Sequence, residues 1–204
     1  MIPVKLKPEP ESFDQNVRQK GNEWLKHHPD PSPTQLPPYW QAVSRDLWES
    51  YSGICAYLAI YFDFATGAST TDHFLPKSQS PTEAYEWRNY RLACLAANRK
   101  KAAQEVLDPF EIEEDSFRID FLDGSIYPNR EKKKDYQKLC EDTINKLDLN
   151  SHLNREKRQN DFTEYCKGHV SKDYLRRHSP FVYSEIVRQK IQPVNSLETI
   201  DFLL

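Results

Sequence analysis

The stretch TTDHFLPKS, residues 70–78, decides the fold of the central part of this chain. Its threonines favour a strand, and Pro76 ends that strand because proline cannot donate a ladder hydrogen bond. Neighbouring strand residues point to opposite faces, so Asp72 and His73 can serve one site only where the strand ends. A carboxylate suits Mg²⁺ or Mn²⁺, and a neutral histidine accepts a proton from water. The pair predicts either a hydrolytic metal site or an ordinary structural pair.

The residues that follow supply a second strand and a helix. Residues 89–94, NYRLAC, predict a short strand, and residues 95–106 are rich in strong helix formers. Asn98 lies on this helix, and its amide oxygen is a hard, neutral ligand that can join Asp72 on one cation. The local order is therefore strand, loop, strand, helix.

Basic residues outnumber acidic ones between Asp72 and Glu105. This excess can neutralise phosphates around a metal, which makes its members candidates for nucleic-acid binding. For the run at 99–101 the alternative is a solvated helix face. The candidates are Lys77, Arg88, Arg91, Arg99, Lys100 and Lys101.

Outward from this core, the sequence predicts one mainly helical α+β domain. Residues 1–38 form an extended, proline-rich lead with one short helix, and 39–110 form the core. The apolar run 52–62 predicts a strand or a buried helix, which periodicity cannot separate. Residues 111–204 form an extension that packs on the core, with a hairpin near 116–129 whose turn is Asp123-Gly124 and helices after it.

Composition excludes several classes of protein. The formal net charge of −3 argues against a general nucleic-acid coat, although a local basic groove remains compatible with it. The four cysteines are far apart and indicate reduced thiols. No signal peptide or membrane-spanning run is visible. We therefore expect a cytoplasmic protein without a membrane partner.

The order TDHFLPKS, YEWRNYRLACLAANRKK and VLDPF resembles HNH endonucleases of the ββα-metal fold, in particular the HNH proteins of Septu-like and retron-associated anti-phage systems. The resemblance is clearest from about residue 53 to 110. It implies that His73 is the general base and that Asn89 holds the hairpin and orients the histidine, so both are predicted as catalytic. It also implies that Asp72 and Asn98 bind Mg²⁺ or Mn²⁺.

Many members of this family frame the core with two C-x-x-C pairs that bind zinc. Here each pair keeps only its first cysteine, because Leu58 follows Cys55 and Ala97 follows Cys94 at the second position. We expect no structural zinc and a hairpin fixed by apolar contacts, with Tyr57 among them. The alternative is a zinc ion completed by distant ligands such as His169 or His178.

The functional expectation is a metal-dependent endonuclease that hydrolyses DNA phosphodiesters, as the nuclease component of an anti-phage system. Septu-like relatives work beside an ATPase, so the resemblance also implies a partner ATPase. The helices after residue 130 would form that interface or complete the monomer's core. A second interpretation is a catalytically silent, HNH-derived DNA-binding or regulatory subunit of an ATPase complex. A third is a structural interaction protein with an accidental motif.

Overall fold

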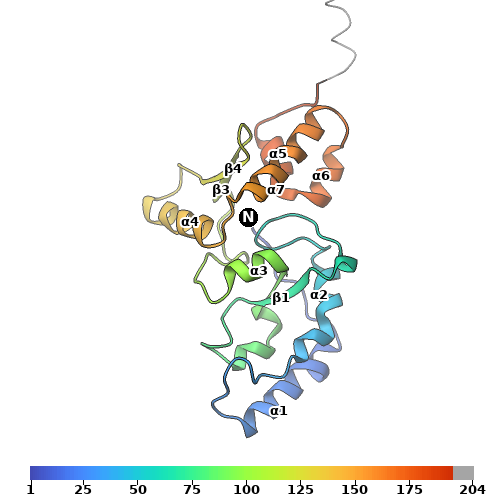
Figure 1. The fold of residues 1–204 in the computed structure, drawn as a ribbon, viewed down its shortest axis with the longest axis vertical. Helices are drawn as coiled ribbons and strands as arrows, with labels where there is room; N and C mark the ends of the chain where they lie inside the picture. The colour runs from blue at the N-terminus through green and yellow to red at the C-terminus, as the bar shows by residue number, and fades with distance from the viewer. Residues whose placement is uncertain (195–204) are drawn as a thin grey trace, which may run out of the picture. The chain divides into compact units, whose positions relative to one another are not determined.

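Two separate antiparallel hairpins contain all the strands in the part of the chain that the structure describes, residues 1–194, and the other regular elements are helices (Figure 1). The structure is a computed structural model. Its mixed α+β, mainly helical character agrees with the expectation from the sequence. Among residues 1–194, none of the helices combines the length and the apolar character that a membrane crossing requires.

The chain divides into two compact units, Met1–Glu114 and Asp115–Leu204, where the sequence predicted a single domain. The division lies four residues beyond the expected end of the core at residue 110. Residues 195–204, the end of the expected extension 111–204, lie outside the described residues.

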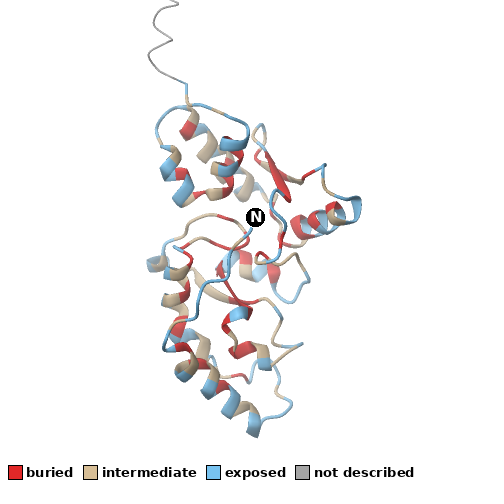
Figure 2. Ribbon diagram, turned by 180° about the vertical axis from the view of Figure 1, so that it is seen from behind, coloured by how far each residue is buried: buried red, intermediate tan, exposed pale blue. Residues whose placement is uncertain are grey.

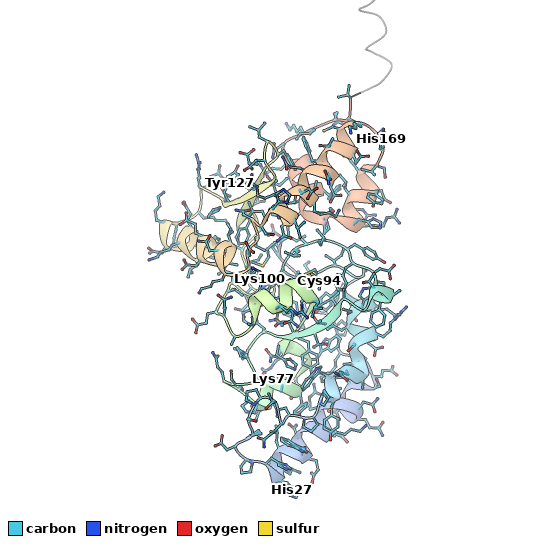
Figure 3. The ribbon with its side chains drawn as sticks, viewed as in Figure 1. His27, Lys77, Cys94, Lys100, Tyr127 and His169 are labelled. Carbon is cyan, nitrogen blue, oxygen red and sulfur yellow. The ribbon has the colours of Figure 1, made fainter. Side chains whose placement is uncertain are left out.

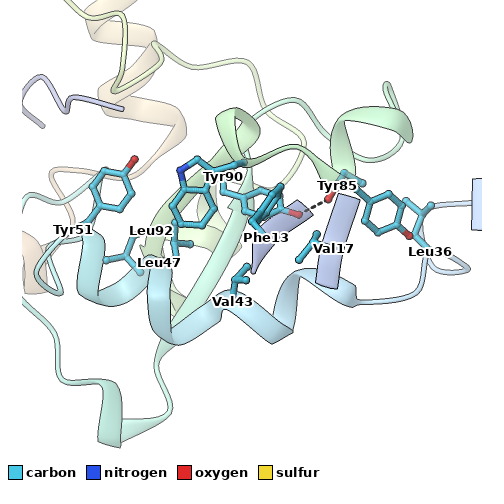
Figure 4. Packing of buried hydrophobic residues seen from close by; sticks show 11 residues of the cluster. Phe13, Val17, Leu36, Val43, Leu47, Tyr51, Tyr85, Tyr90 and Leu92 are labelled. Atoms are coloured by element: carbon cyan, nitrogen blue, oxygen red, sulfur yellow. Dashed lines mark hydrogen bonds between the residues drawn. The ribbon is translucent and has the colours of Figure 1, made fainter. Parts of the chain in front are cut away.

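The first unit begins with a π-helical turn, Asp14–Arg18, that continues into α1, Gln19–His27. A 3₁₀ turn, Tyr39–Val43, leads into α2, Ser44–Ser50. Phe13 and Val17 pack with Val43 and Leu47 in one apolar cluster (Figure 4). Three residues of the expected lead, Phe13, Val17 and Leu36, are therefore part of the core.

Helix α1 approaches the loop that precedes the second strand very closely. At Gly21 a Cβ atom would lie 2.1 Å from Cγ of Tyr85, so only glycine leaves room for the tyrosine ring. Tyr85 is fully buried, and its hydroxyl donates a hydrogen bond to the carbonyl of Pro37 at 3.1 Å. Glycine at this position therefore lets the helix and the loop pack in direct contact.

The predicted order of strand, loop, strand and helix is confirmed. Strand β1, Ser69–His73, pairs antiparallel with β2, Tyr90–Cys94, and α3, Leu95–Lys101, follows at once. His73 is opposite Tyr90 in the register, at the end of β1. The connecting loop contains two short 3₁₀ helices, Thr82–Tyr85 and Trp87–Asn89.

The apolar run at 52–62 is neither a strand nor a helix, so both alternatives for it were wrong. It forms a tight turn over residues 53–62, in which the Cys55 amide donates to the Ile60 carbonyl and the Ala59 amide donates to the Cys55 carbonyl, at 2.9 and 2.8 Å. Ala59 has a positive φ of 52°, a conformation that hydrophobic periodicity does not reveal. We call this segment the 53–62 turn.

The second unit contains the predicted hairpin near 116–129. Strand β3, Phe117–Asp120, pairs with β4, Ser125–Pro128, across a turn in which Gly124 has φ of 71°. The first three residues of β3 are buried (Figure 2). The helices that follow are α4 (Lys134–Lys146), α5 (His152–Cys166), α6 (Lys172–His178) and α7 (Pro180–Arg188).

Candidate active site

A cavity of about 260 Å³ lies at the end of β1. It brings together Asp72 and His73 from β1, Lys77 from the following loop and Asn98 from α3, four of the residues predicted for the site. Asp72 and His73 are neighbours on β1, and their side chains point to opposite faces of the strand. Both can line one cavity because the strand ends at His73. The complete lining is Pro33, Thr71, Asp72, His73, Pro76, Lys77, Ser78, Asn98 and Ala102.

The His73 ring is held in one orientation by the loop. Its Nε2 atom lies 3.0 Å from the carbonyl oxygen of Ala84, and the ring packs edge-on against Trp40 and Tyr90, at 4.6 and 5.2 Å between centroids. A carbonyl oxygen only accepts, so Nε2 carries the proton in this contact. In the described residues Nδ1 makes no hydrogen bond, and it is the ring's basic nitrogen.

Burial keeps this imidazole neutral. His73 is 8% exposed, and the pKa of its ring is lowered to about 4, chiefly by burial and further by the positive charge of Lys77. Near pH 7 the ring is therefore uncharged, and Nδ1 is its unprotonated nitrogen.

Asn89 positions the loop that orients His73. Its Oδ1 accepts a hydrogen bond from the Leu75 amide at 2.7 Å, and its Nδ2 donates to the carbonyls of Leu75 and Glu83 at 3.1 and 3.0 Å. These bonds join the two ends of the loop. Since Glu83 precedes Ala84, Asn89 fixes the carbonyl that holds the imidazole and does not line the cavity itself.

Asp72 is buried beside two groups that stabilise its charge. Its Oδ2 accepts a hydrogen bond from the Tyr57 hydroxyl and lies 4.0 Å from Nζ of Lys101. Burial nevertheless raises the pKa of Asp72, and Lys101 and Tyr57 oppose this rise. The sequence interpretation took Tyr57 as an apolar contact and missed the role of its hydroxyl.

Two residues predicted to bind nucleic acid are buried, which corrects that part of the prediction. Lys101 is fully buried and its Nζ donates to the carbonyls of His73 and Phe74, at 3.2 and 2.6 Å. Arg91 is 3% exposed and forms two hydrogen bonds with Asp108, at 2.8 and 2.5 Å. Neither cation can reach a phosphate, because each already binds partners inside the protein.

The other four basic candidates remain accessible. Lys77, labelled in Figure 3, lines the cavity. Its Nζ lies 4.4 Å from the centroid of the Trp40 ring. Arg88 is exposed and pairs with Glu83 at 2.6 Å. Arg99 and Lys100 are exposed on α3, next to Asn98. A positive surface therefore extends from the cavity along α3.

The donors around the cavity fit a hard cation. Asp72 and Asn98 supply oxygen ligands, and Oγ1 of Thr71 is buried without a hydrogen-bond partner within residues 1–194. Mg²⁺ is commonly bound through one or two carboxylates and keeps several water ligands. In the same range there is no group of three or more His, Cys, Asp or Glu side chains that could hold a metal ion. The site would therefore depend on water and on a substrate to complete the coordination.

The histidines considered as further zinc ligands bind within the second unit. His169 Nδ1 lies 2.8 Å from Glu164, and His178 Nδ1 lies 3.0 Å from the carbonyl of Tyr174.

Comparison of the sequence with protein-family models and with curated proteins finds no match. The case for a function therefore depends on the residues of the cavity.

Proposed function

We propose that this chain is a metal-dependent endonuclease of the HNH type that hydrolyses phosphodiester bonds of DNA. One observation carries the proposal: a histidine with one ring nitrogen fixed by a carbonyl shares a cavity with two oxygen ligands, Asp72 and Asn98. The hairpin and helix that supply these groups follow the order of the ββα-metal fold. The resemblance in sequence supports the same reading.

His73 accepts the proton of the attacking water at Nδ1. A pKa of about 4 makes the isolated ring a weak base, but a bound phosphate adds negative charge nearby and raises the basicity of the imidazole. Lys77, which lines the cavity, attracts the phosphate electrostatically. Arg99 and Lys100 attract the neighbouring phosphates of the DNA strand. Held by Asp72 and Asn98, Mg²⁺ or Mn²⁺ would supply Lewis-acid stabilisation of charge on the phosphate.

A plasmid-nicking assay tests the proposal. Wild-type protein with Mg²⁺ or Mn²⁺ should cut, and chelation should stop it. His73→Ala should lower the rate by about 10²–10⁴, the usual contribution of a general base, while DNA affinity stays nearly unchanged. His27→Ala is the matched control, because His27 is an exposed histidine on α1. Cleavage by His73→Ala at the wild-type rate would rule out the assignment.

A second candidate function is the catalytically silent DNA-binding or regulatory subunit. The observation that favours it is the buried Lys101 ammonium 4.0 Å from Asp72, which already balances the carboxylate charge that a metal ion needs. DNA binding without cutting under every divalent-metal condition, with the natural partner present, would support this second function. A metal-dependent nick by the purified chain would exclude it.

The cysteine pattern supports a place in the cytoplasm, and the resemblance alone supports the rest of the biological setting. We place the protein in an anti-phage system, as the nuclease that works beside a partner ATPase. We assign the ATPase interface to the helices after residue 130, of which α4 is the first. Co-purification with an ATPase from the same locus, lost on deletion of residues 130–204, would test this.

A further inference from the structure

Two cysteines from separate segments meet in the first unit. Cys55 lies in the 53–62 turn. Cys94, labelled in Figure 3, is the last residue of β2, directly before α3. The Ala56 amide donates to the Leu92 carbonyl at 2.8 Å, which fastens the turn to β2 two residues before Cys94. The Cys55 and Cys94 side chains lie close enough to shift each other's pKa, and both cysteines are free thiols. Backbone pairing thus places the two sulfurs together.

The surroundings of the two sulfurs differ in a way that suits thiol chemistry. The pKa of the Cys94 thiol is lowered to about 6, chiefly by its interaction with the Cys55 side chain and further by the backbone amides of Ala97 and Ala96. Burial raises the pKa of Cys55, whose sulfur accepts from the Leu58 amide. Cys94 is 9% exposed and Cys55 is fully buried, so Cys94 is the more accessible of the two residues.

We propose that Cys55 and Cys94 are a reversible dithiol–disulfide pair that a small disulfide such as oxidised glutathione converts to an internal disulfide bond. The proposal does not depend on nuclease activity. The bond closes a covalent loop from residue 55 to residue 94, which contains β1, the loop after it and β2. Oxidation therefore ties the 53–62 turn, with Tyr57, to the strand that leads into α3.

The exchange occurs in two steps. The Cys94 thiolate attacks one sulfur of oxidised glutathione, forms a mixed disulfide and releases one glutathione thiolate. Cys55 then loses its proton to this thiolate or to water, attacks the Cys94 sulfur and releases the second glutathione. Two protein thiols are oxidised, and one glutathione disulfide is reduced to two thiols. Excess reduced glutathione reverses both steps.

Peptide mapping of the folded wild-type protein tests the proposal directly. After incubation with oxidised glutathione and alkylation of the remaining thiols, trypsin should release peptides 46–77 and 92–99 as one linked species, with a mass lower by two hydrogen atoms than the sum of the two peptides. Cys140 and Cys166 should be recovered mostly alkylated, and dithiothreitol should separate the linked peptides. The oxidised protein should also melt at a higher temperature than the reduced protein, because the cross-link constrains the unfolded chain.

Variants and the unfolded protein provide the controls. Cys94→Ser should abolish the linked species, and Cys166→Ser should leave its yield unchanged. The proposal is overturned if the folded protein stays reduced at both cysteines while urea-unfolded protein forms the link. It is equally overturned if oxidation modifies Cys166 alone, or if the cross-linked protein melts no higher than the reduced one. The wild-type measurements stand even where Cys94→Ser fails to fold.

Discussion

The Nε2 atom of His73 lies 3.0 Å from the carbonyl oxygen of Ala84, and the Tyr90 hydroxyl donates to the same oxygen at 2.8 Å (Figure 4). The carbonyl thus fixes both the orientation of the imidazole and the nitrogen that carries its proton. The basicity of Nδ1 therefore depends on the loop as much as on the histidine.

The first prediction concerns stability against pH in the presence of a chelator. The unfolded chain binds a proton at His73 below about pH 6.5, whereas the folded protein binds it only near pH 4. Between these values the unfolded state binds more protons, so the free energy of unfolding should fall as the pH drops from about 6.5 to about 4. The loss from this group is at most about 3 kcal/mol.

Urea unfolding at a series of pH values measures this effect. His73→Gln should flatten the slope, and His27→Gln should retain it. The raised pKa of Asp72 acts in the opposite direction, but it is common to all three proteins and cancels in the comparison. An unchanged slope in His73→Gln would show that other groups cause the acid sensitivity.

The second prediction concerns Asn89. Asn89→Ala removes three part-buried hydrogen bonds, so the protein should lose about 3 kcal/mol of stability. Asn89→Asp should be nearly as damaging, because a carboxylate cannot donate to the carbonyls of Leu75 and Glu83. Chemical denaturation gives the loss. Asn22→Ala, at an exposed position on α1, should change little, and comparable losses in both alanine variants would contradict the positioning role.

The third prediction separates buried from exposed cations. Arg91→Gln should cost about 3 kcal/mol or more, because it leaves Asp108 without its partner, and should not change the salt dependence of DNA binding in protein that remains folded. Arg99→Gln should leave stability nearly unchanged and reduce the slope of log affinity against log salt by about 1. Fluorescence anisotropy across a salt series measures both slopes. An equal reduction by Arg91→Gln would show that Arg91 does contact phosphate.

The fourth prediction concerns the hydroxyl of Tyr57. Tyr57→Phe removes the hydrogen bond that orients the Asp72 carboxylate, and loss of such a partner typically lowers metal affinity by about 10–100-fold. The rise in melting temperature with added Mg²⁺ should therefore need more metal in the variant. Tyr174→Phe, in the second unit, should behave as wild type. If Mg²⁺ does not shift the wild-type melting temperature, the cavity does not bind the ion and the third sequence interpretation, an accidental motif, gains support.

Local sequence signals predicted where several strands and helices lie, but they did not predict which charged side chains are buried. The two hairpins and the helix after β2 could be recognised from alternation, turn residues and helix formers, because these signals are short-range. Arg91 and Lys101 could not be placed by such signals, since their partners are distant in sequence. For Arg91 one signal was available, because its partners Asp108 and Phe110 both lie in the VLDPF stretch that was already singled out. The Arg91 guanidinium lies 3.6 Å from the centroid of the Phe110 ring.

The 53–62 turn shows a further limit of sequence pattern. Its apolar residues resemble a buried strand, but backbone hydrogen bonds and a positive φ at Ala59 determine its shape. The second strand of the site is attached to this turn, and Tyr57 reaches Asp72 from it. The Tyr57 hydroxyl reaches Asp72 because the chain reverses direction in the 53–62 turn, and hydrophobic periodicity does not predict that turn.

The contact between Gly21 and Tyr85 gives the N-terminal helix an indirect influence on the orientation of His73. A methyl group on Gly21 would displace Tyr85, and the neighbouring Ala84 carbonyl would move away from the imidazole with it. A chain shortened to begin at residue 39 would keep Asp72, His73, Asn89 and Asn98, yet lose the surface that supports that carbonyl. A substitution on α1 can therefore disturb the imidazole that we propose as the base without altering any residue of the cavity.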